Sequence, residues 1–341
     1  MRQGNSTTTR ASMAQPGDLT SPEGGRPWED QTLPAQERYD AYTSVVRDKC
    51  QALRESLKRE GVTAEEKRVL AEDPNNKALV AELRQLQSET AEEFCDRLDR
   101  ATEAQTLEAM EKLLGPNFLG AAQWQQGFNV AVGPVPPIPK WITKELLEGE
   151  CELHPEQLVK DTHILMLVPK SVGDKSYSAL ELGELCAKTK GSGDQLIYDQ
   201  DDWANKWKKE SWAKAPQQES EWVLIPKSDP DPSKVSWGQH FRSKTISEQA
   251  EVYKHYADHY REAKALEVMT AALLNDVVNG EPRMLASEGG NWNSLRCVEP
   301  NASGGRVVVG RFLALGLRVR VDFDDFDFAA VGGALVRKSK I

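Results

Sequence analysis

Apolar positions recur every three or four residues after the first tens of residues, the spacing that places side chains on one face of an α-helix. Capping signals mark the expected helix starts, because Thr63-Ala-Glu-Glu66 and Thr90-Ala-Glu-Glu93 fit the capping box and Asp73 precedes a proline. Gly115-Pro116 is the expected end of the last helix. The pattern predicts a helical arm over residues 35–115 with an apolar stripe made of Leu79, Leu83, Leu86, Thr90, Phe94, Leu98 and Ala101.

This stripe has two interpretations. A helical hairpin folded on itself would cover it within one chain, whereas a coiled coil would cover it with a second copy of the protein. The stripe drifts off the repeat of about 3.5 residues that a coiled coil needs, and it includes Thr90 and Ala101. The spacing therefore favours the hairpin, and a homo-oligomer joined through the arm is the alternative.

Residues 116–341 change to short apolar runs separated by glycine, proline and acidic residues, which is typical of a mixed α+β domain. The runs 164–168 and 222–225, each ended by proline, predict two buried strands that pair. Four further runs predict strands of a compact antiparallel sheet at the C-terminus, over residues 293–298, 306–313, 317–323 and 330–337.

Helices are also expected within this domain. Trp124 and Phe128 have helical spacing and are predicted core anchors. A short helix is predicted over residues 178–188 and a long one over 247–280, which should end at Asn279-Gly280.

Residues 1–34 offer little apolar surface to bury and are predicted to form a disordered tail. The predicted organisation is a tail over 1–34, a helical arm over 35–115 and an α+β domain over 116–341. The Ser/Thr-rich start around Asn5 is also compatible with a secretion address, which makes a secreted effector the weaker alternative.

Composition narrows the function classes. The 341 residues include 43 Lys and Arg against 53 Asp and Glu, a net charge of -10, so the chain lacks the basic character typical of nucleic-acid binders. No apolar run reaches the roughly 18 residues of a membrane span. The five cysteines are an odd number and widely spaced, which favours a reduced, cytoplasmic protein.

Two sets of residues are candidate metal ligands. His255 and His259 are four residues apart in the predicted long helix, so both imidazoles could face one metal ion, although Tyr256 stands where a zinc protease has glutamate. The second possibility is a Cys2His2 zinc site made of Cys151, His154, His163 and Cys186. The simpler interpretation of these four residues is a buried histidine and inert thiols.

Three further segments have a chemical interpretation beside a structural one. The acidic run 322–328 is a weak calcium candidate because it lacks the glycine and the distal glutamate of a calcium loop. The proline-rich segment 133–139 should be extended, as a linker or as a ligand for an aromatic groove. An acidic partner could bind basic residues near the C-terminus if they shared one sheet face, namely Arg306, Arg311, Arg318, Arg320, Arg337 and Lys338.

Three stretches together resemble an uncharacterised bacterial family of paralogous proteins. The first joins Cys151-Glu-Leu-His-Pro155, Asp161-Thr-His-Ile-Leu-Met-Leu-Val-Pro169 and Leu180-Glu-Leu-Gly-Glu-Leu185. The second is Glu221-Trp-Val-Leu-Ile-Pro-Lys227, and the third is Val307-Val-Val-Gly-Arg-Phe-Leu-Ala-Leu-Gly-Leu317 with Val331-Gly-Gly-Ala-Leu-Val-Arg-Lys338. The resemblance covers about residues 118–338. It departs from the family pattern at Arg311, where glycine is expected, and in Val331-Gly-Gly-Ala334, where the order of residues is altered. It implies no activity or cofactor, and supports the boundary after the helical arm.

The sequence therefore predicts a non-enzymatic interaction protein that binds another protein, with no cofactor and no membrane segment. The alternative is a metal-dependent hydrolase that uses His255 and His259. No nucleophile elbow, phosphate loop or dinucleotide fingerprint occurs in the chain.

Overall fold

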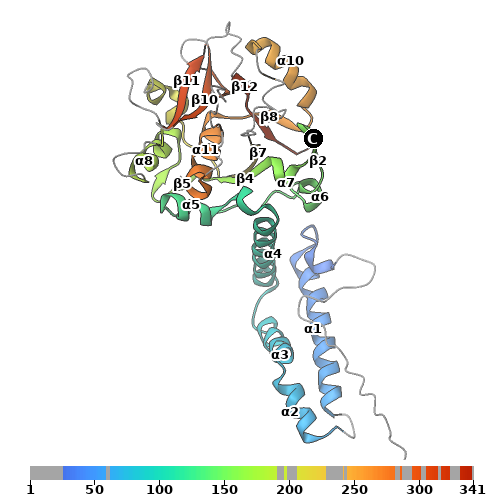
Figure 1. Ribbon diagram of the computed structural model, residues 1–341. Helices are drawn as coiled ribbons and strands as arrows, with labels where there is room; N and C mark the ends of the chain where they lie inside the picture. The colour runs from blue at the N-terminus through green and yellow to red at the C-terminus, as the bar shows by residue number, and fades with distance from the viewer. Residues whose placement is uncertain are drawn as a thin grey trace, which may run out of the picture. The chain divides into compact units, whose positions relative to one another are not determined.

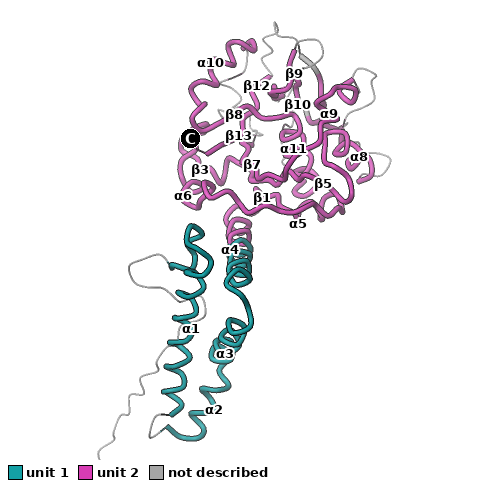
Figure 2. Tube along the Cα trace, turned by 180° about the vertical axis from the view of Figure 1, so that it is seen from behind, with its two compact units in different colours: residues 1–105 teal, residues 106–341 magenta. Residues whose placement is uncertain are grey.

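The computed structural model describes most of the chain after residue 25 and divides it into two compact units, residues 1–105 and residues 106–341 (Figure 2). We call them the helical unit and the α+β unit. The described residues are 26–58, 62–189, 196–197, 206–227, 241, 244–280, 285, 294–300, 305–313, 316–322 and 331–339. The predicted tail lies outside them up to residue 25, and so does the predicted secretion address.

The helical unit is a hairpin, as the spacing favoured. It comprises a short 3-10 turn, η1 (Pro27–Glu29), and the helices α1 (Ala35–Lys58), α2 (Ala64–Glu72), α3 (Pro74–Leu86) and the first part of α4 (Ala91–Leu114). Helix α1 packs against α3, and the two are joined through α2 (Figure 1). The division between the units falls inside α4 rather than at Gly115.

The predicted caps are present at the helix starts. The Thr63 hydroxyl accepts from the backbone of Glu66, whose carboxylate accepts in return, and Asp73 caps α3 ahead of its first-turn proline. The Thr90 amide donates to the Glu93 carboxylate at 2.8 Å, so the second capping box separates α3 from α4. Thr90 and Ala101 are exposed and do not belong to the buried stripe.

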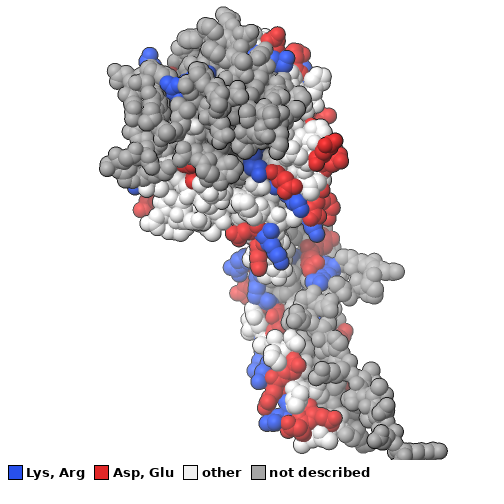
Figure 3. Space-filling view, viewed as in Figure 1, with Lys and Arg blue, Asp and Glu red and all other residues white. Residues whose placement is uncertain are grey.

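Aromatic residues fill the centre of the hairpin. The rings of Tyr39 and Tyr42 lie 5.6 and 4.9 Å from that of Phe94, which is fully buried. Arg38 in α1 donates to the carbonyl of Trp28 and pairs with Asp99 at 2.6 Å, which ties α1 to α4. Acidic and basic side chains are interspersed on the surface of this unit (Figure 3). Arg68 pairs with Glu65 within α2, and Arg97 of α4 pairs with Glu89 in the turn before that helix.

The α+β unit contains two larger sheets and confirms the predicted fold class. The five-stranded sheet has the order β1-β4-β7-β13-β8 and the four-stranded sheet the order β11-β10-β9-β12. Their strands are β1 (Phe118–Leu119), β4 (His163–Val168), β7 (Glu221–Pro226), β13 (Leu335–Arg337) and β8 (Tyr260–Glu262), then β11 (Gly316–Asp322), β10 (Arg306–Leu313), β9 (Ser294–Pro300) and β12 (Val331–Gly333). Two small hairpins are formed by β2 (Glu150–Cys151) with β3 (His154–Leu158) and by β5 (Ser171–Val172) with β6 (Lys175–Ser176).

The remaining elements of this unit are helical. They are η2 (Gly115–Asn117), α5 (Ala121–Phe128), α6 (Lys144–Leu147), α7 (Val159–Thr162), α8 (Ala179–Thr189), η3 (Lys206–Lys209), α9 (Ser211–Lys214), α10 (Ile246–Tyr256) and α11 (Ala265–Asn279). Among the residues described, no helix combines the length and the apolar composition needed to cross a bilayer.

Helix α11 is the centre of the α+β unit. Every residue from Ala265 to Asp276 is buried, because the helix packs against both sheets as well as α5 and α8 (Figure 1). The approach to α5 is close: a Cβ on Gly127 would lie 2.5 Å from the Val277 side chain. Trp124 and Phe128 of α5 are buried in the same core, as predicted.

Strands β4 and β7 pair antiparallel along their full length, as the sequence predicted. The strands near the C-terminus differ from the prediction in two ways. The run 330–337 divides at Ala334, so that β12 pairs with β9 in parallel and β13 enters the other sheet between β7 and β8. The four-stranded sheet is therefore mixed rather than antiparallel.

The predicted long helix over 247–280 is interrupted, and that prediction is wrong. The chain leaves α10 after Tyr256, forms β8, and begins α11 only at Ala265. The cause is a long-range interaction, since β8 pairs with β13 and the Ala263 amide donates to the carbonyl of Ala334 at 2.9 Å. No glycine or proline marks this break in the sequence.

The buried ring of Phe94 should dominate the stability of the helical unit. We expect Phe94→Ala to lower its free energy of unfolding by about 3–5 kcal/mol, because the substitution removes a fully buried ring and leaves a cavity. Hydrogen exchange of α1 and α3 amides in the full chain measures this loss. Val69→Ala is the control: Val69 is 60% exposed, so its change should stay within about 0.5 kcal/mol. Equal protection in both variants would contradict the hairpin core.

Candidate functional site

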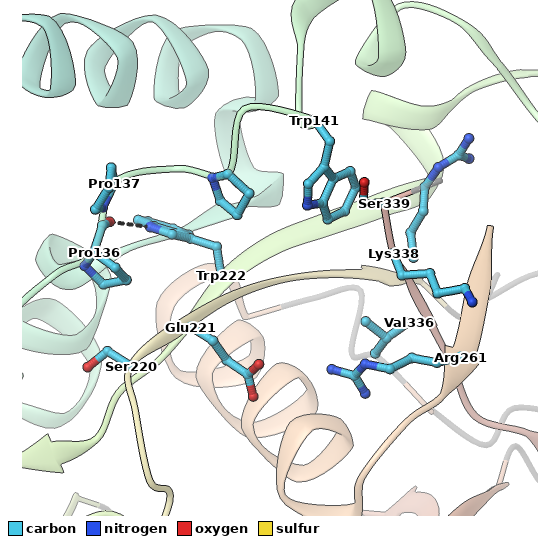
Figure 4. Close-up of a pocket in the computed structure, with 12 residues that line it drawn as sticks. Pro136, Pro137, Trp141, Ser220, Glu221, Trp222, Arg261, Val336, Lys338 and Ser339 are labelled. Atoms are coloured by element: carbon cyan, nitrogen blue, oxygen red, sulfur yellow. Dashed lines mark hydrogen bonds between the residues drawn. The ribbon is translucent and has the colours of Figure 1, made fainter. Parts of the chain in front are cut away.

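A pocket of about 340 Å3 opens at one end of the five-stranded sheet (Figure 4). The proline-rich segment forms one wall. The start of β7, Arg261 in the middle of β8 and the end of β13 form the other. The lining residues are Pro136, Pro137, Pro139, Trp141, Ser220, Glu221, Trp222, Arg261, Val336, Arg337, Lys338 and Ser339. Its volume is at the lower end of the range for ligand pockets, enough for one or two side chains of a bound segment.

The apolar wall is held in place by Trp222. Its indole nitrogen donates to the carbonyl of Pro136 at 2.8 Å, drawn as the dashed line in Figure 4. Its ring lies 5.4 Å from that of Phe118, within the sheet core. The Gly133 amide donates to the carbonyl of Ser171 at 3.0 Å, which fixes the start of the segment. Because proline has a fixed φ and no N–H to satisfy, this wall is rigid before anything binds.

The proline-rich segment is therefore not a free linker. The sequence suggested that an aromatic groove of a partner could bind it, and here Trp222 of the same chain packs on it. Pro134 and Val135, which directly precede the lining prolines, are also exposed, with Val135 at 37%. These two residues continue the exposed apolar surface along the chain next to the pocket.

The charged residues of the pocket are mostly neutralised by neighbours. Arg261 donates to Glu267 through two nitrogens, at 2.9 and 2.5 Å. Glu221 accepts from Gln217 at 2.8 Å. In Figure 4 the side chains of Glu221 and Arg261 point toward one another. Lys338 differs, because its ammonium group has no hydrogen bond or ion pair with a described residue.

A buried polar network supports the floor of the pocket. Arg337 donates to the Tyr260 hydroxyl at 3.1 Å and lies 3.4 Å from the Glu152 carboxylate. The Tyr260 hydroxyl lies 3.3 Å from Nε2 of His163. Because this network joins β13, β8 and β4 to the β2–β3 hairpin, it fixes the strand that supplies Val336 and Lys338 to the pocket.

The network also fixes the protonation of His163. The Thr162 hydroxyl donates its one proton to the carbonyl of Leu158, at 2.9 Å. Its oxygen also lies 2.9 Å from Nδ1 of His163, so in this second hydrogen bond the hydroxyl accepts and Nδ1 donates. Nε2 then accepts from Tyr260. Burial, with the neighbouring Arg337 charge, lowers the pKa of His163 well below its usual value. His163 is therefore a neutral residue of the core.

The structure does not bring His255 and His259 together on one helix. His255 lies in the last turn of α10 and is exposed, whereas His259 lies in the turn before β8. Nδ1 of His259 is 2.6 Å from the Glu152 carboxylate. The predicted helical pair is wrong because the pairing of β8 with β13 ends the helix between the two residues.

The second candidate metal set is divided as well. Cys151 and His154 pair across the β2–β3 hairpin and His163 begins β4, but Cys186 lies on α8. Both nitrogens of His163 already have partners. Within the described part of the chain, no group of three or more His, Cys, Asp or Glu residues has the arrangement of a metal site.

Within the part of the chain that the structure describes, neither the acidic run nor the set of basic residues near the C-terminus forms a binding site as a group. Residues 323–328 of the acidic run lie outside the described residues. The basic residues near the C-terminus do not share one face, because Arg306, Arg318 and Arg320 are in the four-stranded sheet and Arg337 is in the other. Arg306 donates to the carbonyl of Val298.

The pocket itself could not be found in the sequence. The proline run and the strand beginning at Trp222 were both evident, but nothing local shows that residues 86 positions apart join through Trp222 and Pro136. Comparisons with family models, with curated proteins and with solved structures found no match for this chain. Any function proposed for the pocket therefore rests on its geometry alone.

The buried His163 gives a pH prediction. Its pKa is lowered on folding, so below the unfolded value of about 6.5 the unfolded state binds a proton that the folded state does not. Stability should therefore be complete above about pH 6.5 and fall as the pH drops below it, with a slope of up to about 1.4 kcal/mol per pH unit.

Urea unfolding of the full chain between about pH 5.5 and about pH 7.5, an interval that brackets the usual histidine pKa, measures this slope. We expect His163→Asn to reduce the slope over this interval, whatever it does to stability at neutral pH. His255→Asn is the control, because that side chain is exposed. The same pH dependence in the wild type and His163→Asn would show that His163 is not the responsible group.

Proposed function

We propose that this chain is a non-enzymatic binding protein whose α+β unit binds a short segment of a partner protein at the pocket between the proline-rich segment and β13. One observation carries the proposal: a pocket of about 340 Å3 combines a rigid apolar wall with a single unpaired cation, Lys338, among its described lining residues. The other features of the pocket define which segment it would accept.

The apolar wall favours a large apolar side chain. Trp141 is partly exposed beside Pro137 and Pro139, so an aliphatic or aromatic group inserted here would cover rings that water now contacts. Because Trp222 already holds this wall in place, little ordering is needed on binding. Such rigid aromatic residues are the usual energetic centres of interfaces.

The charges favour an acidic residue beside that apolar group. Arg261 and Glu221 already have partners within the chain, whereas Lys338 is available to a carboxylate. Exposed ion pairs contribute little affinity but influence which partner binds. The proposed partner segment therefore has a large apolar residue next to Asp or Glu.

The cytoplasm is the proposed location, supported by five cysteines that are all free and buried. Membership of the paralogous bacterial family is likewise a proposal that rests on the three resembling stretches. Neither the location nor the family membership bears on the pocket.

Selection from a random-peptide display library against the full-length protein tests the proposed function. We expect enriched peptides to share a large apolar residue adjacent to an acidic one. Trp141→Ala should weaken their binding by at least about tenfold, because it removes the exposed ring of the pocket. Lys338→Gln should weaken it by a few-fold, with the difference shrinking at high salt. Isothermal titration with one selected peptide measures these changes.

Lys140→Gln is the matched control, since Lys140 is exposed next to the proline-rich segment and is not a lining residue. Its affinity should equal that of the wild type. Two results contradict the proposal: no peptide is enriched, or the enriched peptides bind Trp141→Ala as well as they bind the wild type.

A further inference from the structure

A second region carries an independent inference, the segment 206–214 that forms η3 and α9. Its two tryptophans stack, with ring centroids 5.9 Å apart and planes 24° from parallel. Trp207 is 1% exposed and packs in the core of the α+β unit, whereas Trp212 is only partly buried. The segment lies against α8 and β11 and shares no lining residue with the pocket.

Both indole N–H groups of this pair lack an acceptor. Nε1 of Trp207 and Nε1 of Trp212 are buried, and neither has a hydrogen-bond partner within the described chain. By contrast, Trp124 donates to the carbonyl of Leu167 at 3.0 Å and Trp222 to that of Pro136 at 2.8 Å. A buried donor without an acceptor is costly and rare in folded proteins. Two of them on stacked rings indicate that an acceptor is supplied from elsewhere.

The charges around the pair specify the kind of acceptor. The segment contains four lysines and one acidic residue, in a chain whose net charge is -10. Lys206, Lys209 and Lys214 are exposed and make no ion pair among the described residues. The ammonium group of Lys208 lies 5.9 Å from the ring centre of Trp207. Two unpaired N–H donors next to unpaired ammonium groups favour an anion over a neutral acceptor.

We propose that the segment 206–214 binds an oxyanion, a phosphate or carboxylate group, whose oxygens accept hydrogen bonds from Trp207 and Trp212 while the lysines balance its charge. Trp212 is the more exposed ring of the pair, so we expect it to be the first that an anion from solvent contacts. This site is separate from the proposed peptide pocket, so either can fail without the other.

Indole nitrogen and proton NMR signals test this directly. The full chain is labelled at tryptophan with nitrogen-15 and titrated with inorganic phosphate at constant ionic strength set with chloride. We expect the signals of Trp207 and Trp212 to move and to saturate, while those of Trp124 and Trp222 stay in place because their donors already have acceptors. Acetate in a parallel titration separates carboxylate from phosphate binding, and saturation by either supports the site.

Substitutions assign the signals and measure the contribution of each group. Trp212→Phe keeps an aromatic ring but removes one donor, so phosphate affinity should fall about tenfold, as for a hydrogen bond to a charged group. Lys209→Gln with Lys214→Gln should weaken binding several-fold, and Lys140→Gln should leave it unchanged. Trp212 is partly exposed, so this variant is informative even if Trp207→Phe fails to fold.

Two outcomes would overturn the proposal. In one, neither indole signal responds to phosphate or acetate, and cross-peaks to water show that a bound water satisfies the donors. In the other, the signals of Trp124 and Trp222 move in proportion to those of Trp207 and Trp212, which indicates a non-specific salt effect.

Discussion

The insertion of β13 between β7 and β8 is the interaction on which the α+β unit depends. It interrupts a segment with strong helical character, since β8 forms only by pairing with β13. It also links the two sheets, because the chain passes from β12 to β13 through a single residue, Ala334. The crossing requires glycine at position 333, because a Cβ there would lie 2.5 Å from the Tyr253 hydroxyl.

The same strand positions the functional surface. Val336 and Lys338 reach the pocket because β13 ends beside the start of β7, while Arg337 connects to Tyr260 and Glu152 in the buried network. Buried ionic groups of this kind contribute little net stability, but they are costly to leave unpaired. The network therefore fixes the register of β13, and through it the positions of the pocket residues.

Local signals in the sequence were sufficient for the elements that local physics decides. The capping box at Thr63 and the proline after Asp73 placed helix starts correctly, and the apolar runs of β4 and β7 identified a strand pair. These patterns depend on residues a few positions apart. Hydrogen bonds within one turn, or burial of a continuous run, are enough to establish them.

The rest depends on contacts between distant residues. His255 and His259 have helical spacing, but pairing of β8 with the end of the chain places them on different elements. The pocket exists because Trp222 binds the carbonyl of Pro136, and no pattern near either residue indicates that contact. Single-sequence reasoning could propose the aromatic and proline residues as candidates, but it could not assemble them.

The energetics of the pocket indicate how much of a partner must be involved. Burying one large apolar side chain contributes about 1.5–3 kcal/mol, and an exposed ion pair with Lys338 at most about 1 kcal/mol. Association itself costs at least about 4 kcal/mol, so one inserted residue would not hold a partner. Exposed Pro134 and Val135, next to the lining prolines, supply additional apolar surface. A partner segment must therefore extend over several residues along the proline-rich segment, with its apolar residue in the pocket.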